Sequence, residues 1–409
     1  MILKKLQQLK GGGIFVAATF FSQVFNFLFN AYLGRTLPYE QFALITLIVN
    51  IWYFILIILN ALSFLMTNRT AYLEKHEGAG TLPEFYHFFT KRTLQISLAT
   101  GIIWLLLTPV LVYFFHIHDW LSILMISPLI VAAAILSTNR GFLQGRMFFT
   151  EASIVLVTES VARFIYVYFL VREGLGAFSY WSIPAAIITA LVVSYIFTRR
   201  HVPKPEKTSS HRFAHTLFIA LILSGISTTA FLTVDMFMVK HYFSDRVAGM
   251  YALLVLTGKI IFFFCSLLNS VLFTYASQKG KNAYTMFYRI LAAVAGLSII
   301  AFFIFGVFGS FTIHILLGEK ATAIFPYLLV YTAANCVFAF TNAFITFHIA
   351  RDEKKISLVS FGMACILVIA IATFHASLFQ IVYSFFTVSV IGWVIVIAGH
   401  IIQKKQYAI

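Results

Sequence analysis

Long apolar segments alternate with short polar connections along almost the whole sequence. Twelve segments are each long enough to cross a bilayer as a helix, near 14–33, 41–66, 94–115, 120–138, 148–171, 178–198, 214–238, 247–275, 288–317, 322–349, 356–374 and 378–402. Within lipid, backbone N–H and C=O groups are all hydrogen-bonded only in helices or closed β-barrels. These runs lack the alternation of apolar and polar residues that barrel strands show. The pattern predicts an all-α integral membrane protein with twelve transmembrane helices.

The composition agrees with this interpretation. Hydrophobic residues make up 61% of the 409 residues and charged residues only 11%, too few to cover a soluble domain of this size. The three cysteines, Cys265, Cys336 and Cys365, stand alone in apolar runs and form no CxxC pair. We therefore expect them to be packing residues rather than disulfide partners or zinc ligands.

The two halves of the sequence repeat each other. The stretch NFLFNAYLGRTLPYEQFALITLIVN begins at Asn26, and DMFMVKHYFSDRVAGMYALLVLTGK begins 209 residues later at Asp235. The polar stretch 199–213 lies near the midpoint and contains two prolines. We predict an N-terminal six-helix lobe at 1–198, a cytoplasmic linker at 199–213 and a C-terminal six-helix lobe at 214–409, arranged as a parallel repeat around a central cavity.

The basic residues predict the orientation of the chain in the membrane. With the N-terminus inside, 22 Lys and Arg residues lie in cytoplasmic connections or ends, and five lie outside. The positive-inside rule then places both termini in the cytoplasm. This asymmetry accounts for most of the formal charge of +15, so no nucleic-acid partner is expected.

Glu159, Arg163, Asp235 and Lys259 lie at membrane depth within the predicted helices, where charge is costly and marks candidate functional positions. Glu159 and Arg163 are four residues apart and share one helical face, so they can pair. Lys259 has Asp235 as its best partner, at equal depth on the preceding helix. Two interpretations remain open, which are structural ion pairs and groups facing a cavity that binds an anionic ligand.

Amide side chains extend this candidate site. Asn26 and Asn30 share one face of the first helix with Gln23, and Asn50 is the repeat counterpart of Lys259. Such amides either bridge helices or line a pathway. We predict Lys259, Arg163, Asn26, Asn30 and Asn50 as substrate-binding residues, and Asp235 and Glu159 as candidate ion-coupling residues.

Enzymatic chemistry has little support in the sequence. His116, His118 and Asp119 lie together on an external loop, but three such residues at a helix end are expected to be solvated rather than to bind metal. No nucleotide, flavin or hydrolase motif occurs in a suitable context, so we expect neither a metal nor a cofactor. The external loops are also too short to form a catalytic domain, and we predict that the protein is not an enzyme.

Several segments resemble one family of transporters. LGRTLPYEQFALITL after the first helix, TVDMFMVKHYFSDRVAGMYALLVLTGKI, ILLGEKATAIFPYLLV and FITFHIARDEKKISLVS occur in the same order as the matching segments of bacterial polysaccharide flippases. By these motifs the chain resembles the Wzx-type oligosaccharide flippases of the multidrug/oligosaccharidyl-lipid/polysaccharide (MOP) exporter superfamily.

The resemblance implies two six-helix lobes around a cationic cavity. It implies a flippase that moves an undecaprenyl-diphosphate-linked oligosaccharide from the inner to the outer leaflet of a bacterial or archaeal cytoplasmic membrane, for surface polysaccharide such as O-antigen. Lys259 falls where related lipid II flippases keep a cavity arginine. Expected partners are the lipid-linked sugar, the bilayer, H⁺ or Na⁺ as coupling ion, and other polysaccharide assembly proteins. The alternative is an ion-coupled antiporter of drug or metabolite cations with the same fold.

Overall fold

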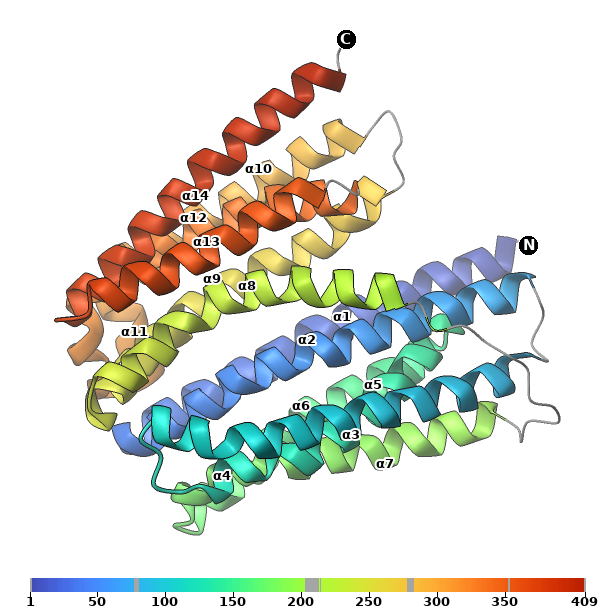
Figure 1. Cartoon of the computed structure of the whole chain (residues 1–409), viewed down its shortest axis with the longest axis horizontal. Coiled ribbons are helices and arrows are strands. Elements are labelled where there is room, and N and C mark those ends of the chain that lie inside the picture. Colours follow the sequence, from blue (N-terminus) through green and yellow to red (C-terminus); the bar gives the residue numbers. More distant parts are fainter. Residues whose placement is uncertain are drawn as a thin grey trace. The chain divides into compact units, whose positions relative to one another are not determined.

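The computed structural model describes residues 2–76, 81–202, 213, 215–277, 283–351 and 354–407, and every regular element in these ranges is a helix (Figure 1). Eleven helices of the described chain are long and apolar enough to span a membrane. The remaining predicted segment, 356–374, coincides with α13 (Lys354–Thr373), of which Val359–Thr373 counts as a shorter apolar helix. The predicted all-α membrane fold is confirmed, while the cytoplasmic placement of the termini stays a prediction.

Two compact units make up the chain. The first contains Met1–Phe29 and Ile51–Ile222, and the second contains Asn30–Asn50 and Leu223–Ile409. The hairpin between the first two helices therefore belongs to the second unit, although it comes early in the sequence. The predicted lobes 1–198 and 214–409 stay a prediction, and most of the linker 199–213 lies outside the described residues.

The first unit is built from long helices with one short insertion. Its elements are α1 (Ile2–Thr36) up to Phe29, α2 (Tyr39–His76) from Ile51, α3 (Leu82–Phe114), α4 (Leu121–Leu124), α5 (Ile126–Gly145), α6 (Phe149–Arg172), the 3₁₀ helix η2 (Gly176–Trp181), α7 (Ser182–His201) and the start of α8 (His215–Tyr242). Within it α5 packs against α3 and α7, and α7 also packs against α6.

The second unit continues with α8 from Leu223 and surrounds a long central helix. Its further elements are α9 (Asp245–Ser277), α10 (Ala283–Ala301), the π-helix η3 (Phe302–Val307), α11 (Gly309–Leu317), the 3₁₀ helix η4 (Gly318–Ile324), α12 (Phe325–Ala350), α13 and α14 (Leu378–Tyr407). The central helix is α12, which packs against α9, α10, α13 and α14.

One predicted helix is divided in the structure. The apolar run 288–317 was expected to form a single span, but α10 ends at Ala301 and continues as a π-helix to Val307. The chain then starts the separate helix α11 at Gly309. Gly306 and Gly309 lie at this interruption, where glycine lowers the helix propensity without changing the apolar pattern. Hydropathy alone therefore misses the break.

Close helix packing in the first unit depends on two glycines of α5. A β-carbon at Gly141 would lie 2.6 Å from the Ser63 carbonyl oxygen of α2, and one at Gly145 would lie 2.7 Å from the Thr67 carbonyl oxygen. The Thr67 hydroxyl also donates a hydrogen bond to the Gly141 carbonyl at 3.1 Å. Small residues four apart let membrane helices approach closely. This contact fixes α5 against α2, and α5 carries part of the candidate site.

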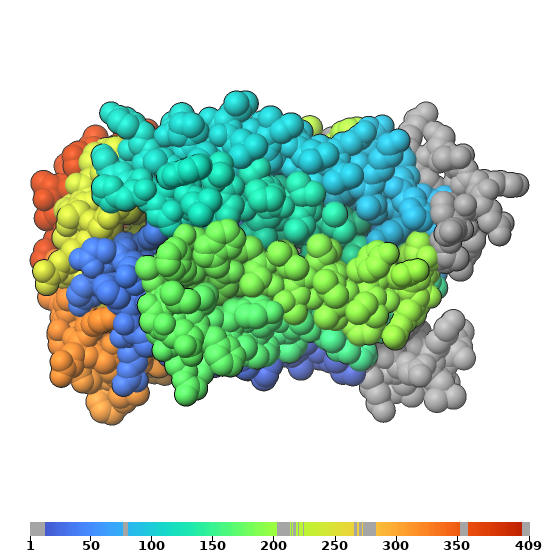
Figure 2. All heavy atoms as spheres, turned by 90° about the horizontal axis from the view of Figure 1, so that it is seen from below, coloured from blue at the N-terminus to red at the C-terminus, as the bar shows by residue number. Residues whose placement is uncertain are grey.

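The outer surface of the helices is strongly apolar. On α3, Ile102, Leu106 and Val110 are 58%, 74% and 59% exposed, and Val192 on α7 is 55% exposed. Figure 2 shows these two helices, in cyan and green, across the face viewed. Exposed apolar area of this extent is unfavourable in water but suits contact with lipid chains. The polar residues discussed below are buried or half-buried instead.

Candidate functional site

In the first unit, two arginines share one carboxylate. Arg163 Nη2 donates to Glu159 Oε1 at 3.0 Å within α6, and Arg140 Nη2 of α5 lies 3.5 Å from Glu159 Oε2. Arg163 Nη1 also donates to Asn26 Oδ1 of α1 at 3.3 Å. Three helices thus bring together two positive charges, one negative charge and an amide. We call Asn26, Arg140, Glu159 and Arg163 the arginine cluster.

The arginine cluster is only partly screened from its surroundings. The side chains of Arg140, Glu159 and Arg163 are 19%, 16% and 14% exposed. Arg163 Nε is itself buried and has no hydrogen-bond partner among the described residues. Because two guanidinium groups face one carboxylate, the cluster has one excess positive charge and unused donor capacity. An anion with several oxygen atoms matches both properties.

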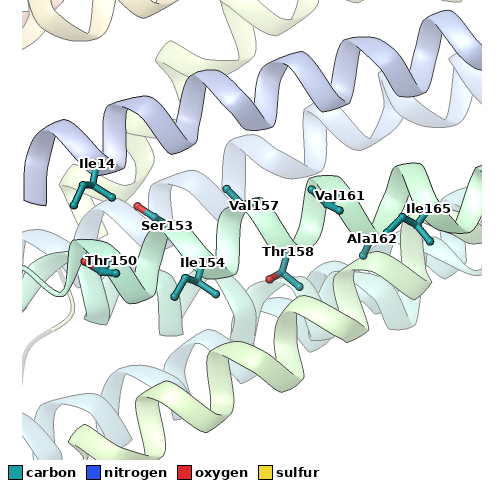
Figure 3. A pocket seen from close by; sticks show the side chains of 9 residues that line it. All are labelled: Ile14, Thr150, Ser153, Ile154, Val157, Thr158, Val161, Ala162 and Ile165. Atoms are coloured by element: carbon teal, nitrogen blue, oxygen red, sulfur yellow. The ribbon is translucent and has the colours of Figure 1, made fainter.

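The two faces of α6 differ in character. Glu159 is two residues from Val157 and Val161, so it points about 160–200° away from them around the helix. Figure 3 shows those valines with Ile154 and Ile165 along one face of α6, beside Ile14 of α1, where they line an apolar groove of about 490 Å³. Glu159, and Arg163 one turn further along, therefore lie on the face opposite the groove. This separation explains how a charged pair fits into an otherwise apolar helix.

In the second unit, a buried carboxylate is enclosed by tyrosines. Asp235 of α8 accepts hydrogen bonds at its Oδ2 from Tyr251 of α9 at 2.9 Å and from Tyr331 of α12 at 2.8 Å. Its Oδ1 accepts from the Met236 backbone N–H at 2.8 Å. Asp235 is only 1% exposed. Three donors thus satisfy the buried carboxyl oxygens, which would be costly to leave without hydrogen bonds at this depth.

Lys259, on α9, lies close to the Asp235 carboxylate. Its Nζ donates to Asn50 Oδ1 of α2, and the charges of Lys259 and Asp235 interact. Asn50 is fully buried, and its Nδ2 has no hydrogen-bond partner among the described residues. The repeat counterparts Asn50 and Lys259 are therefore direct neighbours. We call Asn50, Asp235, Tyr251, Lys259 and Tyr331 the lysine cluster.

The predicted site residues thus fall into two groups. Arg163, Glu159 and Asn26 meet in the first unit, while Lys259, Asn50 and Asp235 meet in the second. Asn30 lies one helical turn beyond Asn26 on α1 and is half-buried. That all of them line one cavity stays a prediction, as do their roles in substrate binding and ion coupling.

Three members of these clusters were missed at the level of sequence. Arg140 was counted as a cytoplasmic residue, but it lies five residues before the end of α5 at Gly145 and reaches Glu159. Residues 137–141 read STNRG, a polar stretch, so the hydropathy pattern gave no signal that Arg140 lies within a helix. Tyr331 carried no signal beyond its place in an apolar helix, and Tyr251 stood only within a segment that resembles the flippases, with no role of its own.

The loop that contains His116, His118 and Asp119 forms a structural contact through Asp119. The Tyr180 hydroxyl donates to Asp119 Oδ2 at 2.6 Å, linking η2 to the loop before α4. Within the described ranges, no group of three or more His, Cys, Asp or Glu side chains is placed to bind a metal ion.

Comparison with known proteins gives a family and a fold. The model of the family described as "Polysaccharide biosynthesis protein" matches residues 8–280. No curated protein matches the sequence significantly.

Solved structures resemble the whole chain. The lipid II flippase MurJ in an inward closed conformation has a TM-score of 0.69 and 16% identity, with 94% of this chain and 87% of that chain covered. An inward-facing multidrug resistance MATE family transporter of the MOP superfamily has a TM-score of 0.66 and 14% identity, covering 94% and 96%. A MOP superfamily transporter from Pyrococcus furiosus, described by a binding pocket of reverse polarity, has a TM-score of 0.59 and 12% identity, covering 95% and 94%.

The family model covers well over half of the chain, and the structural matches extend over nearly all of it. Their low sequence identity limits the structural matches to fold. The resemblance to Wzx-type flippases is thus confirmed at the level of family and superfamily fold: the chain belongs to the polysaccharide biosynthesis protein family and has the fold of MOP superfamily transporters.

Proposed function

We propose that this protein is a flippase that moves an undecaprenyl-diphosphate-linked oligosaccharide from the inner to the outer leaflet by alternating access. It acts in a bacterial or archaeal cytoplasmic membrane, for surface polysaccharide biosynthesis. Membership in the polysaccharide biosynthesis family supports the substrate class, and the fold shared with a lipid II flippase supports the mode of transport. The protein performs no catalytic step in this proposal.

The observation that carries the proposal is the arginine cluster. Its two guanidinium groups exceed its single carboxylate by one positive charge, at a place where the helices are otherwise apolar. A diphosphate offers several oxygen atoms to Arg140 and Arg163, whose planar donors match phosphate geometry. Asn26 adds an amide that can donate to a phosphate or sugar oxygen once it turns away from Arg163.

Glu159 makes the binding reversible in this proposal. When the diphosphate enters, it replaces the carboxylate as the partner of at least one arginine. When the diphosphate leaves, Glu159 pairs with that arginine again, so no guanidinium group remains unpaired at membrane depth. A carrier needs this exchange because a substrate held too tightly is not released.

In the second unit, Lys259 is a further candidate cation for binding an anionic substrate. Its Nζ donates to the neutral Asn50, and its charge interacts with that of Asp235. Asp235 also accepts hydrogen bonds from two tyrosines. An inside-negative membrane potential assists the outward step, since two negative charges moving out gain about 4–5 kcal/mol per 100 mV.

The second candidate function is an ion-coupled antiporter of drug or metabolite cations. The similarity to MATE family transporters and the buried Asp235 favour it. Such a site needs uncompensated acids, whereas Glu159 is shared by two arginines and Asp235 is surrounded by donors. We therefore rank it second, and keep Glu159 and Asp235 as candidates for coupling H⁺ or Na⁺ to the return step. Other polysaccharide assembly proteins are proposed as partners.

Transport in proteoliposomes tests the proposal. We expect the wild-type protein to flip undecaprenyl-diphosphate-linked oligosaccharide, and Arg163→Ala and Lys259→Ala to reduce the initial rate at least about tenfold, as loss of one charge-assisted contact implies. Arg172→Ala and Arg246→Ala are matched controls, because these arginines are exposed on the same helices, α6 and α9. Normal flipping by both Arg163→Ala and Lys259→Ala contradicts the proposal. Export of organic cations instead of the lipid favours the antiporter.

A further inference from the structure

A chain of three hydrogen-bonding side chains connects three helices of the second unit and shares no residue with either cluster. His348 Nε2 of α12 lies 3.0 Å from His400 Nδ1 of α14. On its other side, His400 Nε2 lies 3.1 Å from the Tyr288 hydroxyl of α10. The two histidines are 1% and 4% exposed, whereas Tyr288 is 40% exposed. The chain thus leads from a buried histidine pair to the surface of the unit.

The hydrogen bonds of the pair fit more than one proton arrangement. A neutral imidazole has one N–H and one acceptor nitrogen, so all protons in the chain can point toward Tyr288 or all toward His348. One additional proton is also accommodated, because a charged His400 donates through both nitrogens to His348 and to Tyr288. A second additional proton would make two N–H groups face each other. The pair therefore has room for one proton.

Aromatic rings surround His400 on several sides. The ring centroids of Phe287 and Phe344 both lie 5.2 Å from that of His400, and those of Tyr288, Phe347 and Tyr284 lie at 6.0, 6.1 and 6.3 Å. Aromatic faces and hydroxyl groups stabilise a nearby cation through the ring quadrupole and through hydrogen bonds. This surrounding favours an imidazolium ion more than an aliphatic core would.

Within the described part of the chain, a charged neighbour of this cage is Arg351, directly after α12. Its guanidinium carbon lies 4.9 Å from the Tyr284 ring centroid and 5.7 Å from that of Phe347. Arg289 on α10 follows Tyr288 but is exposed. The side chains of Lys354 and Lys355 on α13 and of Lys404 and Lys405 on α14 are outside the described part of the chain, as are Asp352 and Glu353. The cation of Arg351 opposes a second charge, which again limits the pair to one proton.

We propose that His348 and His400 form a proton-binding site that controls the junction of α10, α12 and α14. Hydrogen bonds from a charged donor are roughly twice as strong as neutral ones, so a bound proton tightens this junction. Helix rearrangement in this part of the unit then becomes slower as the pH falls. The effect on transport rests on the proposed flippase function, whereas proton binding by the pair does not.

Nuclear magnetic resonance of the wild-type protein in lipid nanodiscs tests the site itself. With ¹⁵N-labelled histidine, we expect one of the two rings to titrate between about pH 5 and 8, where histidine normally changes charge, and the other to stay neutral. Signals are assigned with His348→Gln and His400→Gln. If both rings stay neutral down to pH 5, or if both become charged, the proposal is overturned.

A flipping assay across the same pH range tests the consequence for transport. We expect the wild-type rate at pH 5.5 to be about three- to tenfold below that at pH 8, as a strengthened hydrogen bond would produce. His348→Gln, whose amide can donate and accept without titrating, should reduce this ratio to below about twofold. His314→Gln is the control, because His314 is exposed on α11 in the same unit.

The outcomes separate the two proposals. An unchanged pH ratio in folded His348→Gln overturns control by the pair, even when the wild-type protein flips lipid normally. Absence of wild-type flipping at every pH contradicts the proposed function, and the spectroscopic titration then still decides whether the pair binds a proton. If His348→Gln fails to fold, hydrogen exchange of α12 and α14 in the wild-type protein replaces this test. After correction for intrinsic exchange rates, we expect greater protection of these helices at low pH. Unchanged protection counts against the proposal.

Discussion

The arginine cluster and the lysine cluster solve the problem of charge inside a membrane in different ways. In the first unit, one carboxylate is shared by two arginines, and all three side chains keep some exposure. In the second unit, Asp235 is 1% exposed and accepts three hydrogen bonds from neutral groups. The first arrangement contains more donors than its carboxylate can use, while in the second both oxygens of the carboxylate accept from buried neutral donors.

This difference indicates which charges can change partners. A carboxylate enclosed by two tyrosines and a backbone N–H gains little from moving, because every new arrangement leaves buried donors unpaired. A carboxylate shared between two guanidinium groups can give up one of them to a competing anion at small cost. We infer that the arginine cluster exchanges partners during transport, and that the carboxylate of the lysine cluster mainly holds α8, α9 and α12 together.

The largest expected effect comes from removing the enclosed carboxylate. Asp235→Ala leaves Tyr251 and Tyr331 without their acceptor and Lys259 without its nearby negative charge. We expect a loss of about 3–5 kcal/mol in the free energy of unfolding, as is usual when one partner of a buried charged network is removed. It should appear as a large fall in Tm of the purified protein.

The matched control for this change is Glu159→Ala in the arginine cluster. Its loss should be smaller, because both arginines are partly exposed and can be solvated. If Glu159→Ala lowers Tm as much as Asp235→Ala does, the two clusters do not differ in the way inferred here.

A smaller effect is expected from shortening the tyrosines. Tyr331→Phe removes one hydroxyl from Asp235 and leaves the ring, which stacks on Phe385 with centroids 5.4 Å apart. We expect a loss of about 1–3 kcal/mol, the typical cost of leaving one buried polar group with fewer hydrogen bonds. Tyr383→Phe, at an exposed position on α14, is the control. Equal Tm values for Tyr331→Phe and the control would mean that the hydrogen bond from Tyr331 to Asp235 contributes nothing to stability.

The sequence predicted the helices well because lipid imposes a simple rule on their length and composition. Every predicted apolar segment overlaps helices of the described chain, but 288–317 is divided into α10, η3 and α11, and 120–138, 178–198 and 322–349 begin in the short helices α4, η2 and η4. That division depends on backbone geometry near Gly306 and Gly309, which hydropathy does not record. The assignment of residues 30–50 to the second unit was likewise inaccessible, because it depends on tertiary contacts.

Prediction of the candidate site succeeded where spacing along one helix was sufficient. Glu159 and Arg163 were recognised as a pair because they lie four residues apart, and the structure joins them at 3.0 Å. Arg140 required knowledge of how α5 packs on α6, and Tyr251 and Tyr331 required the positions of three helices. The contact between Asn50 and Lys259 was indicated only by their equivalence in the internal repeat.

The most direct test of the central claim is the affinity of the purified protein for undecaprenyl diphosphate, measured by titration in detergent. If the arginine cluster exchanges Glu159 for the diphosphate, Arg163→Ala should raise the Kd about tenfold, and Glu159→Gln should lower it by a similar factor, because one charge-assisted contact corresponds to roughly 1–2 kcal/mol. Glu173→Gln, an exposed acid just after α6, should leave the Kd unchanged. Weaker or unchanged binding by Glu159→Gln, together with normal binding by Arg163→Ala, would contradict the claim.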